Sequence, residues 1–133
     1  MSELLHKKIT EDIIRIYFDI YNQLGYGFLE KIYQNAMFFE LKKQGYNVKA
    51  QTPIKVYLNG QLLGEYYSDL LVEDKVIVEL KACDLLMTPH VAQLINYLKA
   101  TEIEVGLLLN FGEKAEFKRI IYTNDRKKNL KNQ

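Results

Sequence analysis

The sequence has little of what would mark a secreted, membrane-bound or disordered chain. Its 133 residues include only one cysteine, Cys83, and two prolines. One thiol cannot form an internal disulfide, and a zinc site needs several ligands close together, so both kinds of scaffold are excluded. No apolar run approaches the roughly 20 residues of a membrane span, and Met1 to Lys8 lacks a signal-peptide core. We therefore expect a reduced, cytoplasmic protein without membrane association.

Charge of one sign is also scarce. Eighteen Lys and Arg residues stand against seventeen Asp and Glu, which gives a formal net charge of +1. Many nucleic-acid-binding domains carry a strong basic excess, so any basic patch on this protein has to be local. Net charge mildly opposes nucleic-acid binding, and such a function must be argued from particular residues.

The length suits one compact domain. Hydrophobic residues make up 48% of the chain and charged residues 26%, which is ordinary for a globular protein. We predict a single domain over residues 1–125. A basic, polar tail over 126–133 is expected to fray.

Apolar periodicity predicts elements in the order α-α-β-β-β-α-β-β. The predicted helices cover 3–24, 28–43 and 88–101. The predicted strands cover 49–58, 61–72, 76–82, 104–110 and 116–122. The first strand is expected to be interrupted near Pro53, Asn59-Gly60 to form a hairpin turn, and Thr88 to cap the third helix before Pro89. That helix is a crossover, so the strands on either side of it should be parallel. The fold class is therefore α/β, with a mixed five-stranded sheet flanked by helices.

Two charged residues interrupt the third predicted strand, which is otherwise apolar. Glu79 and Lys81 stand two residues apart, so their side chains share one face of the strand. Burying an isolated charge is costly, so something must compensate them. The preceding strand carries Asp69. A turn centred on Asp74 would place Asp69 opposite Glu79, whereas a two-residue turn would place it opposite Val78.

The first register would set two carboxylates side by side. Like charges directly opposite each other are destabilising without a counter-ion, and a divalent cation between Asp69 and Glu79 would remove that penalty. Oxygen ligands of this kind suit magnesium or manganese. Lys81 could then stabilise charge on a phosphate or help to place a water. The alternative is an ion pair of Lys81 with either acid, which an isolated Glu-x-Lys triplet would favour.

Four residues resemble the signature of the PD-(D/E)xK nuclease superfamily: Asp69, Glu79, Leu80 and Lys81. Ser68 stands where a proline is usual, at a position that varies in the superfamily. The resemblance implies that both acids bind magnesium and that Lys81 is catalytic. It also implies that the backbone carbonyl of Leu80 adds a metal ligand.

The segment Gly27-Phe-Leu-Glu30-Lys-Ile-Tyr33 resembles the motif of the GxxExxY protein family, which is assigned by similarity to the same superfamily. The resemblance implies that Glu30 completes the metal site and that Tyr33 helps to position substrate. The two residues share a helix face. Spacing alone would favour a core role for Tyr33 and a solvated role for Glu30, whose acid suits a helix N-terminus.

The segment Gln93-Leu-Ile-Asn-Tyr97 resembles the Q-x-x-x-Y motif of RecB-type members of the superfamily. Residues four apart on a helix project together, so Gln93 and Tyr97 could both hydrogen-bond a phosphate or the acids. His90 lies one turn earlier and is a further candidate for positioning substrate. Surface positions for Gln93 and His90 are the alternatives.

The three motifs follow the order of the family, and the resemblance covers about Ile9 to Tyr122. It implies a restriction-endonuclease-like core that hydrolyses phosphodiester bonds of nucleic acid, with DNA favoured, aided by Mg²⁺ or Mn²⁺. A catalytically silent module of the same fold, binding nucleic acid or a protein partner, is an alternative that the neutral charge favours. A third possibility is an oligomeric subunit, such as a homodimer, with aromatic surface buried between chains.

Overall fold

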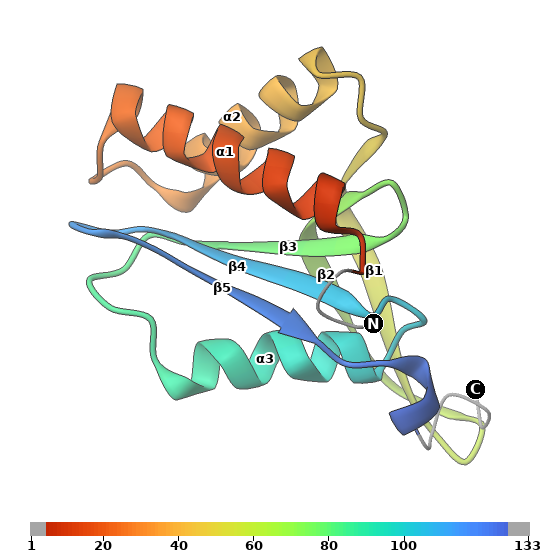
Figure 1. Cartoon of the computed structure of the whole chain (residues 1–133). Helices are drawn as coiled ribbons and strands as arrows, with labels where there is room; N and C mark the ends of the chain where they lie inside the picture. Colours follow the sequence, from red (N-terminus) through yellow and green to blue (C-terminus); the bar gives the residue numbers. More distant parts are fainter. Residues whose placement is uncertain (1–4, 128–133) are drawn as a thin grey trace.

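The computed structural model describes residues 5–127 and stacks them in three layers (Figure 1). The elements are α1 (Lys7–Leu24), α2 (Glu30–Lys43), β1 (Val48–Leu58), β2 (Gln61–Val72), β3 (Val76–Lys81), α3 (Thr88–Lys99), β4 (Val105–Phe111), β5 (Ala115–Ile121) and the short 3-10 helix η2 (Asn124–Arg126). The element order and the α/β class confirm the prediction. The first helix begins at Lys7, and residues 3–4 of the expected helix lie outside the described residues.

The sheet runs in the order β1-β2-β3-β4-β5. Strands β3 and β4 are parallel and the other neighbours are antiparallel, as the crossover helix predicts. Helices α1 and α2 cover one face of the sheet and α3 covers the other (Figure 1). No helix within residues 5–127 is long and apolar enough to cross a membrane.

Strand β3 is the centre of the core because both of its faces are covered. Val78 and Leu80 pack with the residues of α1 and α2, whereas Ile77 packs with Leu94 and Leu98 of α3. This alternation puts Glu79 on the same face as Ile77, toward α3. Burial on both faces explains why β3 reads as a nearly continuous apolar run.

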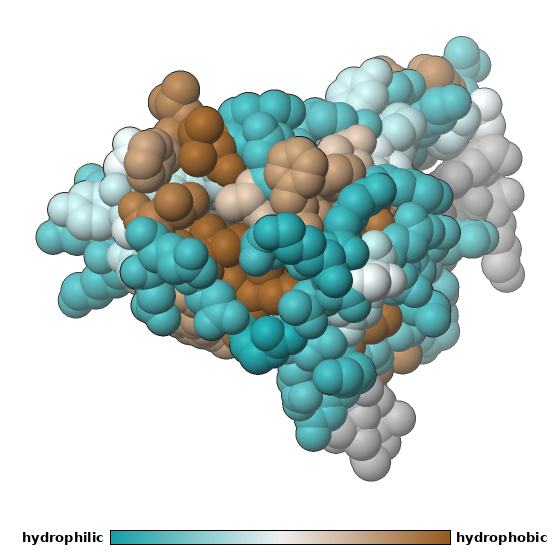
Figure 2. Space-filling model, turned by 90° about the horizontal axis from the view of Figure 1, so that it is seen from above, coloured by the Kyte–Doolittle hydropathy of each residue, from teal (hydrophilic) through white to brown (hydrophobic). Residues whose placement is uncertain are grey.

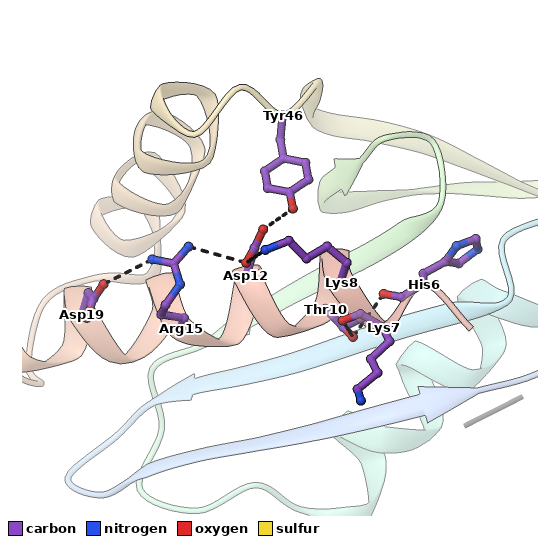
Figure 3. Close-up of polar contacts among 8 residues, drawn as sticks. All are labelled: His6, Lys7, Lys8, Thr10, Asp12, Arg15, Asp19 and Tyr46. Atoms are coloured by element: carbon purple, nitrogen blue, oxygen red, sulfur yellow. Dashed lines mark hydrogen bonds and ion pairs between the residues drawn. The ribbon is translucent and has the colours of Figure 1, made fainter. Parts of the chain in front are cut away.

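Helix α1 carries a row of charged side chains, shown in Figure 3. Lys8 pairs with Asp12 at 3.1 Å, and Arg15 lies 3.6 Å from Asp12 and 3.8 Å from Asp19. Such exposed pairs contribute little stability. The Tyr46 hydroxyl also donates to Asp12, which ties α1 to the segment between α2 and β1.

The β1–β2 hairpin has the turn and the interrupted first strand that the sequence predicts. Asn59 and Gly60 form the turn with positive φ values of 50° and 78°, as the Asn-Gly signal predicts. The interruption expected near Pro53 lies two residues earlier, at Gln51, which has a φ of 54° and no partner in the ladder. Pro53 itself pairs normally with Tyr67.

The basic tail expected to fray, 126–133, begins at a residue that belongs to a short helix. Residues Asn124–Arg126 form η2, and Lys127 follows with only 8% of its surface exposed. Its ammonium donates to the carbonyls of Thr101 and Ile103 at 2.9 and 2.7 Å. The packed part of the chain therefore reaches Lys127, and residues 128–133 of the expected tail lie outside the described residues.

Candidate functional site

A three-residue turn over 73–75 joins β2 to β3 and fixes the register of the site. Its first two residues have positive φ values of 55° and 53°. Across this turn Leu70 pairs with Val78, so the next positions along, Asp69 and Glu79, lie opposite each other. The longer of the two turns considered for the sequence is therefore the one formed.

The carboxylates of this acid pair bond to the backbone of the opposite strand. The Asp69 N–H donates to Glu79 Oε2, and the Leu80 N–H donates to Asp69 Oδ2, both at 2.8 Å. Backbone pairing of β2 with β3 ends at Leu70, so the two side chains replace the ladder where the strands separate. Within residues 5–127 no hydrogen bond reaches the other oxygens, Oδ1 of Asp69 and Oε1 of Glu79.

The acid pair is buried enough for its charges to be costly. Glu79 is only 4% exposed. Burial raises the pKa of Glu79 to about 8, with further rises from the negative charges of Asp69 and, to a smaller extent, Glu30. Burial also raises the pKa of Asp69, against the opposing effects of the Leu80 N–H and the Lys81 charge. Two adjacent acids in this state favour a nearby cation.

Lys81 is held by α3 and not by the acids. Its Nζ donates to Oε1 of Gln93 at 3.1 Å. Among residues 5–127 no ion pair joins Lys81 to Asp69 or Glu79, so the strand-end ion pair considered as an alternative does not form. The ammonium stays close enough to lower the pKa of both acids.

Tyr97 lies one turn after Gln93 and beside the same acids. Its ring is 6% exposed. Burial, with added effects from the charges of Glu79 and Asp69, raises the pKa of Tyr97 to about 12. The i, i+4 pair on α3 thus reaches the candidate site as the motif predicts, and Tyr97 keeps its proton at neutral pH.

His90 caps α3. Its Nδ1 accepts a hydrogen bond from the N–H of Met87 at 2.9 Å, and Met87 is the N-cap residue of the helix. The expected capping role of Thr88 is therefore wrong, because Thr88 is already the first helical residue. The cap fixes where α3 begins, at Thr88, five residues before Gln93.

Tyr33 holds the loop that leads into α2. Its hydroxyl donates to the carbonyl of Gly25 at 2.7 Å and accepts from the N–H of Phe28 at 3.2 Å. Its ring is fully buried and stacks on Phe111, with centroids 4.1 Å apart. These contacts place the start of α2, where Glu30 is the first helical residue.

Glu30 is near the acid pair but does not build a cluster with it. Its charge raises the pKa of Glu79, while the charge of Lys31 lowers that of Asp69. In the part of the chain that the structure describes, no three acidic, histidine or cysteine side chains converge as a metal site. The acidic side chains that could hold a cation here are therefore the two carboxylates of the acid pair.

Two further polar residues support the site without having been singled out in the sequence. Asn110 is fully buried and bonds to both the N–H and the carbonyl of Cys83, at 3.1 and 2.8 Å, which fixes the chain just after β3. The sequence did contain a sign of this role, because Asn110 is a polar residue at the end of an otherwise apolar strand. Gln51 stands in β1 between the residues that pair with Leu70 and Ser68, and it bonds to Gln34 of α2 at 3.1 Å. No pattern in the sequence pointed to this bond.

Comparison with known proteins gives a family for this chain and a solved structure with a similar fold. A family model described as the PD-(D/E)XK nuclease superfamily matches residues 7–120. The chain is similar to a solved structure titled "Crystal structure of SSO0001", with 17% sequence identity and a TM-score of 0.58 over 77% of this chain and 55% of that chain. It thus spans about half the length of that protein, and the likeness shows the fold alone. No curated protein matches the sequence.

Proposed function

The chain belongs to the PD-(D/E)XK nuclease superfamily, and on that premise we propose that it hydrolyses phosphodiester bonds of nucleic acid, with DNA preferred. The acid pair carries the proposal. Asp69 and Glu79 are bonded to each other's strands at the point where β2 and β3 separate. Lys81 follows on the same face of β3, which brings opposite charges to one place where a phosphate could bind.

A divalent cation, magnesium or manganese, fits the acid pair. Two partly buried carboxylates of like charge lie side by side, and each has one oxygen without a hydrogen bond among residues 5–127. Hard cations prefer such oxygen ligands. We assign the cation to Asp69, Glu79 and the Leu80 carbonyl, with Glu30 adding negative charge from α2. When bound, the cation would neutralise phosphate charge and make a nearby water more acidic.

The other side chains position the substrate. Gln93 holds the Lys81 ammonium, which would donate to a phosphate oxygen or orient the attacking water. Tyr97 remains protonated because its pKa is about 12, so its hydroxyl would serve as a second donor to the phosphate. His90 and Tyr33 would act indirectly, His90 through the start of α3 and Tyr33 through the loop before Glu30.

A cleavage assay tests this function. Wild type, Lys81→Ala and the control Lys118→Ala, an exposed lysine on β5, are incubated with DNA and RNA in magnesium or manganese. Loss of a donor to transition-state charge typically lowers turnover by about 100-fold or more, so Lys81→Ala should lose cleavage while keeping the circular dichroism spectrum of wild type. Lys118→Ala should cleave normally.

A catalytically silent binding module is the second candidate. The observations that favour it are the net charge of +1 and the lack of a third metal-binding side chain at the acid pair within residues 5–127. Wild type that binds nucleic acid but cleaves neither DNA nor RNA with either metal would support this candidate and contradict the nuclease.

Three finer predictions accompany the proposal: membership of the GxxExxY family, a cytoplasmic location and a homodimer.

The homodimer has support from the surface. Apolar side chains gather on the side of the molecule that α1 and α2 cover (Figure 2). The large exposed ones at the end of α1, the following loop and α2 are Leu24, Tyr26, Phe28, Leu29, Ile32 and Phe39. A surface of this kind is typical of a protein interface. Light scattering of the purified chain should give the mass of two chains, and the mass of a monomer would contradict the homodimer.

A further inference from the structure

A groove lies beside the proposed catalytic residues and has no ligand in the chemistry described above. It encloses about 540 Å³ between α3 and the β1–β2 hairpin. Gln93 and Tyr97 line this groove. Gln93 also accepts a hydrogen bond from Lys81, and Tyr97 lies close enough to Glu79 and Asp69 for their charges to raise its pKa. These two residues therefore connect the groove to the place where a phosphodiester would be cleaved.

The outer wall of the groove is a part of the hairpin that projects beyond the sheet. The backbone of β2 pairs with β3 only over Leu70–Val72, and the part of β2 before Asp69 pairs with β1 alone and runs on past the end of β3 (Figure 1). From this arm Tyr66 reaches α3, where its ring centroid lies 5.6 Å from that of Tyr97. Tyr66 is nevertheless 53% exposed, which leaves part of its ring open to a ligand.

The lining combines a mainly apolar wall with a few polar groups. Val56, Ala92 and the two tyrosine rings supply the apolar surface, and no acidic residue among 5–127 lines the groove. Asn96 brings an amide, which can both donate and accept hydrogen bonds. A flat aromatic body with a polar edge matches this lining, and nucleobases have that shape and stack on aromatic side chains.

We propose that this groove binds one unpaired nucleobase next to the cleaved bond, so that the substrate is single-stranded nucleic acid. The inference rests on the proposed nuclease function, because that function places the phosphate at Lys81. A base attached to the neighbouring sugar would then lie at the mouth of the groove. In a duplex each base is stacked and paired, and it could enter only by leaving the helix.

Binding to a short fluorescein-labelled oligothymidylate, followed by fluorescence anisotropy without metal, tests the groove. Stacking on one aromatic side chain is worth about ten-fold or more in affinity, so Tyr66→Ala should weaken binding by that factor. The matched control is Tyr67→Ala, since Tyr67 is the next residue of β2, is equally exposed at 53% and does not line the groove. It should bind within about two-fold of wild type.

Three further ligands and one further variant complete the binding test. Tyr66→Ala and Tyr67→Ala should bind an abasic oligomer of the same length with equal affinity, because this oligomer has phosphates but no bases. The thymidylate annealed to its complement should bind more weakly than the single strand, and an oligouridylate shows whether RNA is accepted as well. Asn96→Ala, on the opposite wall, should also weaken binding of the single strand and serves if Tyr66→Ala fails to fold.

The outcomes distinguish this inference from the nuclease proposal. If Tyr66→Ala and Asn96→Ala bind and cleave single strands as Tyr67→Ala does, or if duplex is bound and cut equally well, the groove proposal is overturned and the nuclease stands. If wild type cleaves nothing but its binding of single strands depends on Tyr66, the groove stands and the nuclease is overturned.

Discussion

Glu79 is the residue whose charge is least compatible with its surroundings. It is almost fully buried and lies against a second carboxylate. The fold therefore favours the protonated form, and burial raises its pKa from 4.5 to about 8. The stabilisation from that proton is complete below pH 4.5 and is lost as the pH rises to about 8.

Glu79→Gln should therefore stabilise the metal-free protein at neutral and higher pH. The amide can still accept the bond from the Asp69 N–H but carries no charge. Its advantage in the free energy of unfolding should be small at pH 4.5 and grow to roughly 1–3 kcal/mol near pH 8. Urea unfolding with a chelator present measures this, with the exposed Glu113→Gln as control. Parallel pH profiles for Glu79→Gln and wild type would contradict it.

The Tyr33 hydroxyl is a second group whose removal should change the stability of the fold. Tyr33→Phe keeps the ring stacked on Phe111 and removes the bonds to Gly25 and Phe28. Losing these bonds should lower the free energy of unfolding by about 1–2 kcal/mol. Tyr26→Phe, at a neighbouring tyrosine that is 59% exposed, should change it little. Thermal unfolding of both variants gives the comparison, and equal midpoints would show that the hydroxyl does not hold the loop.

Among the elements, the turn between β4 and β5 is packed against the chain that leaves β3. A Cβ placed on Gly112 would lie 2.1 Å from the carbonyl oxygen of Cys83 and 2.9 Å from the amide nitrogen of Asn110. The Cys83 backbone is itself bonded to Asn110. Neither group can move without breaking these bonds.

Gly112→Ala should consequently destabilise the protein by about 1–3 kcal/mol. Gly64→Ala in β2 is the matched control, because a Cβ there meets no atom within 4 Å. Denaturant midpoints of the two variants measure the difference. A Gly112→Ala protein as stable as Gly64→Ala would show that the contact between the turn and Cys83 is easily relieved.

Sequence patterns predicted the elements better than the details that orient them. Apolar spacing was enough to place the helices and strands, because burial on one or both faces leaves a local period. It left two registers open for Asp69, since Glu73 is not a residue type that favours the positive φ found in the turn. It also missed the bond of Gln51 to Gln34, whose partners are 17 residues apart and share no local pattern.

For the whole molecule, metal binding should appear as added stability. A cation that binds only the folded chain raises the free energy of unfolding by about 1.4 kcal/mol for each tenfold excess over its dissociation constant. Wild type should therefore unfold at rising temperatures as manganese is added, and Asp69→Asn should not. Asp19→Asn, an exposed acid of α1, should respond as wild type does. An equal response of Asp69→Asn would place the metal elsewhere.

The reciprocal bonds of the acid pair have a consequence for the evolution of this fold. Because Asp69 and Glu79 also satisfy backbone N–H groups where two strands part, a lineage that abandons catalysis would still lose stability by replacing them with apolar residues. Lys81 does not satisfy a backbone group in this way, since its hydrogen bond is to the Gln93 side chain. If the proposed function is right, retention of the lysine in relatives of this protein should therefore indicate catalysis better than retention of the acids does.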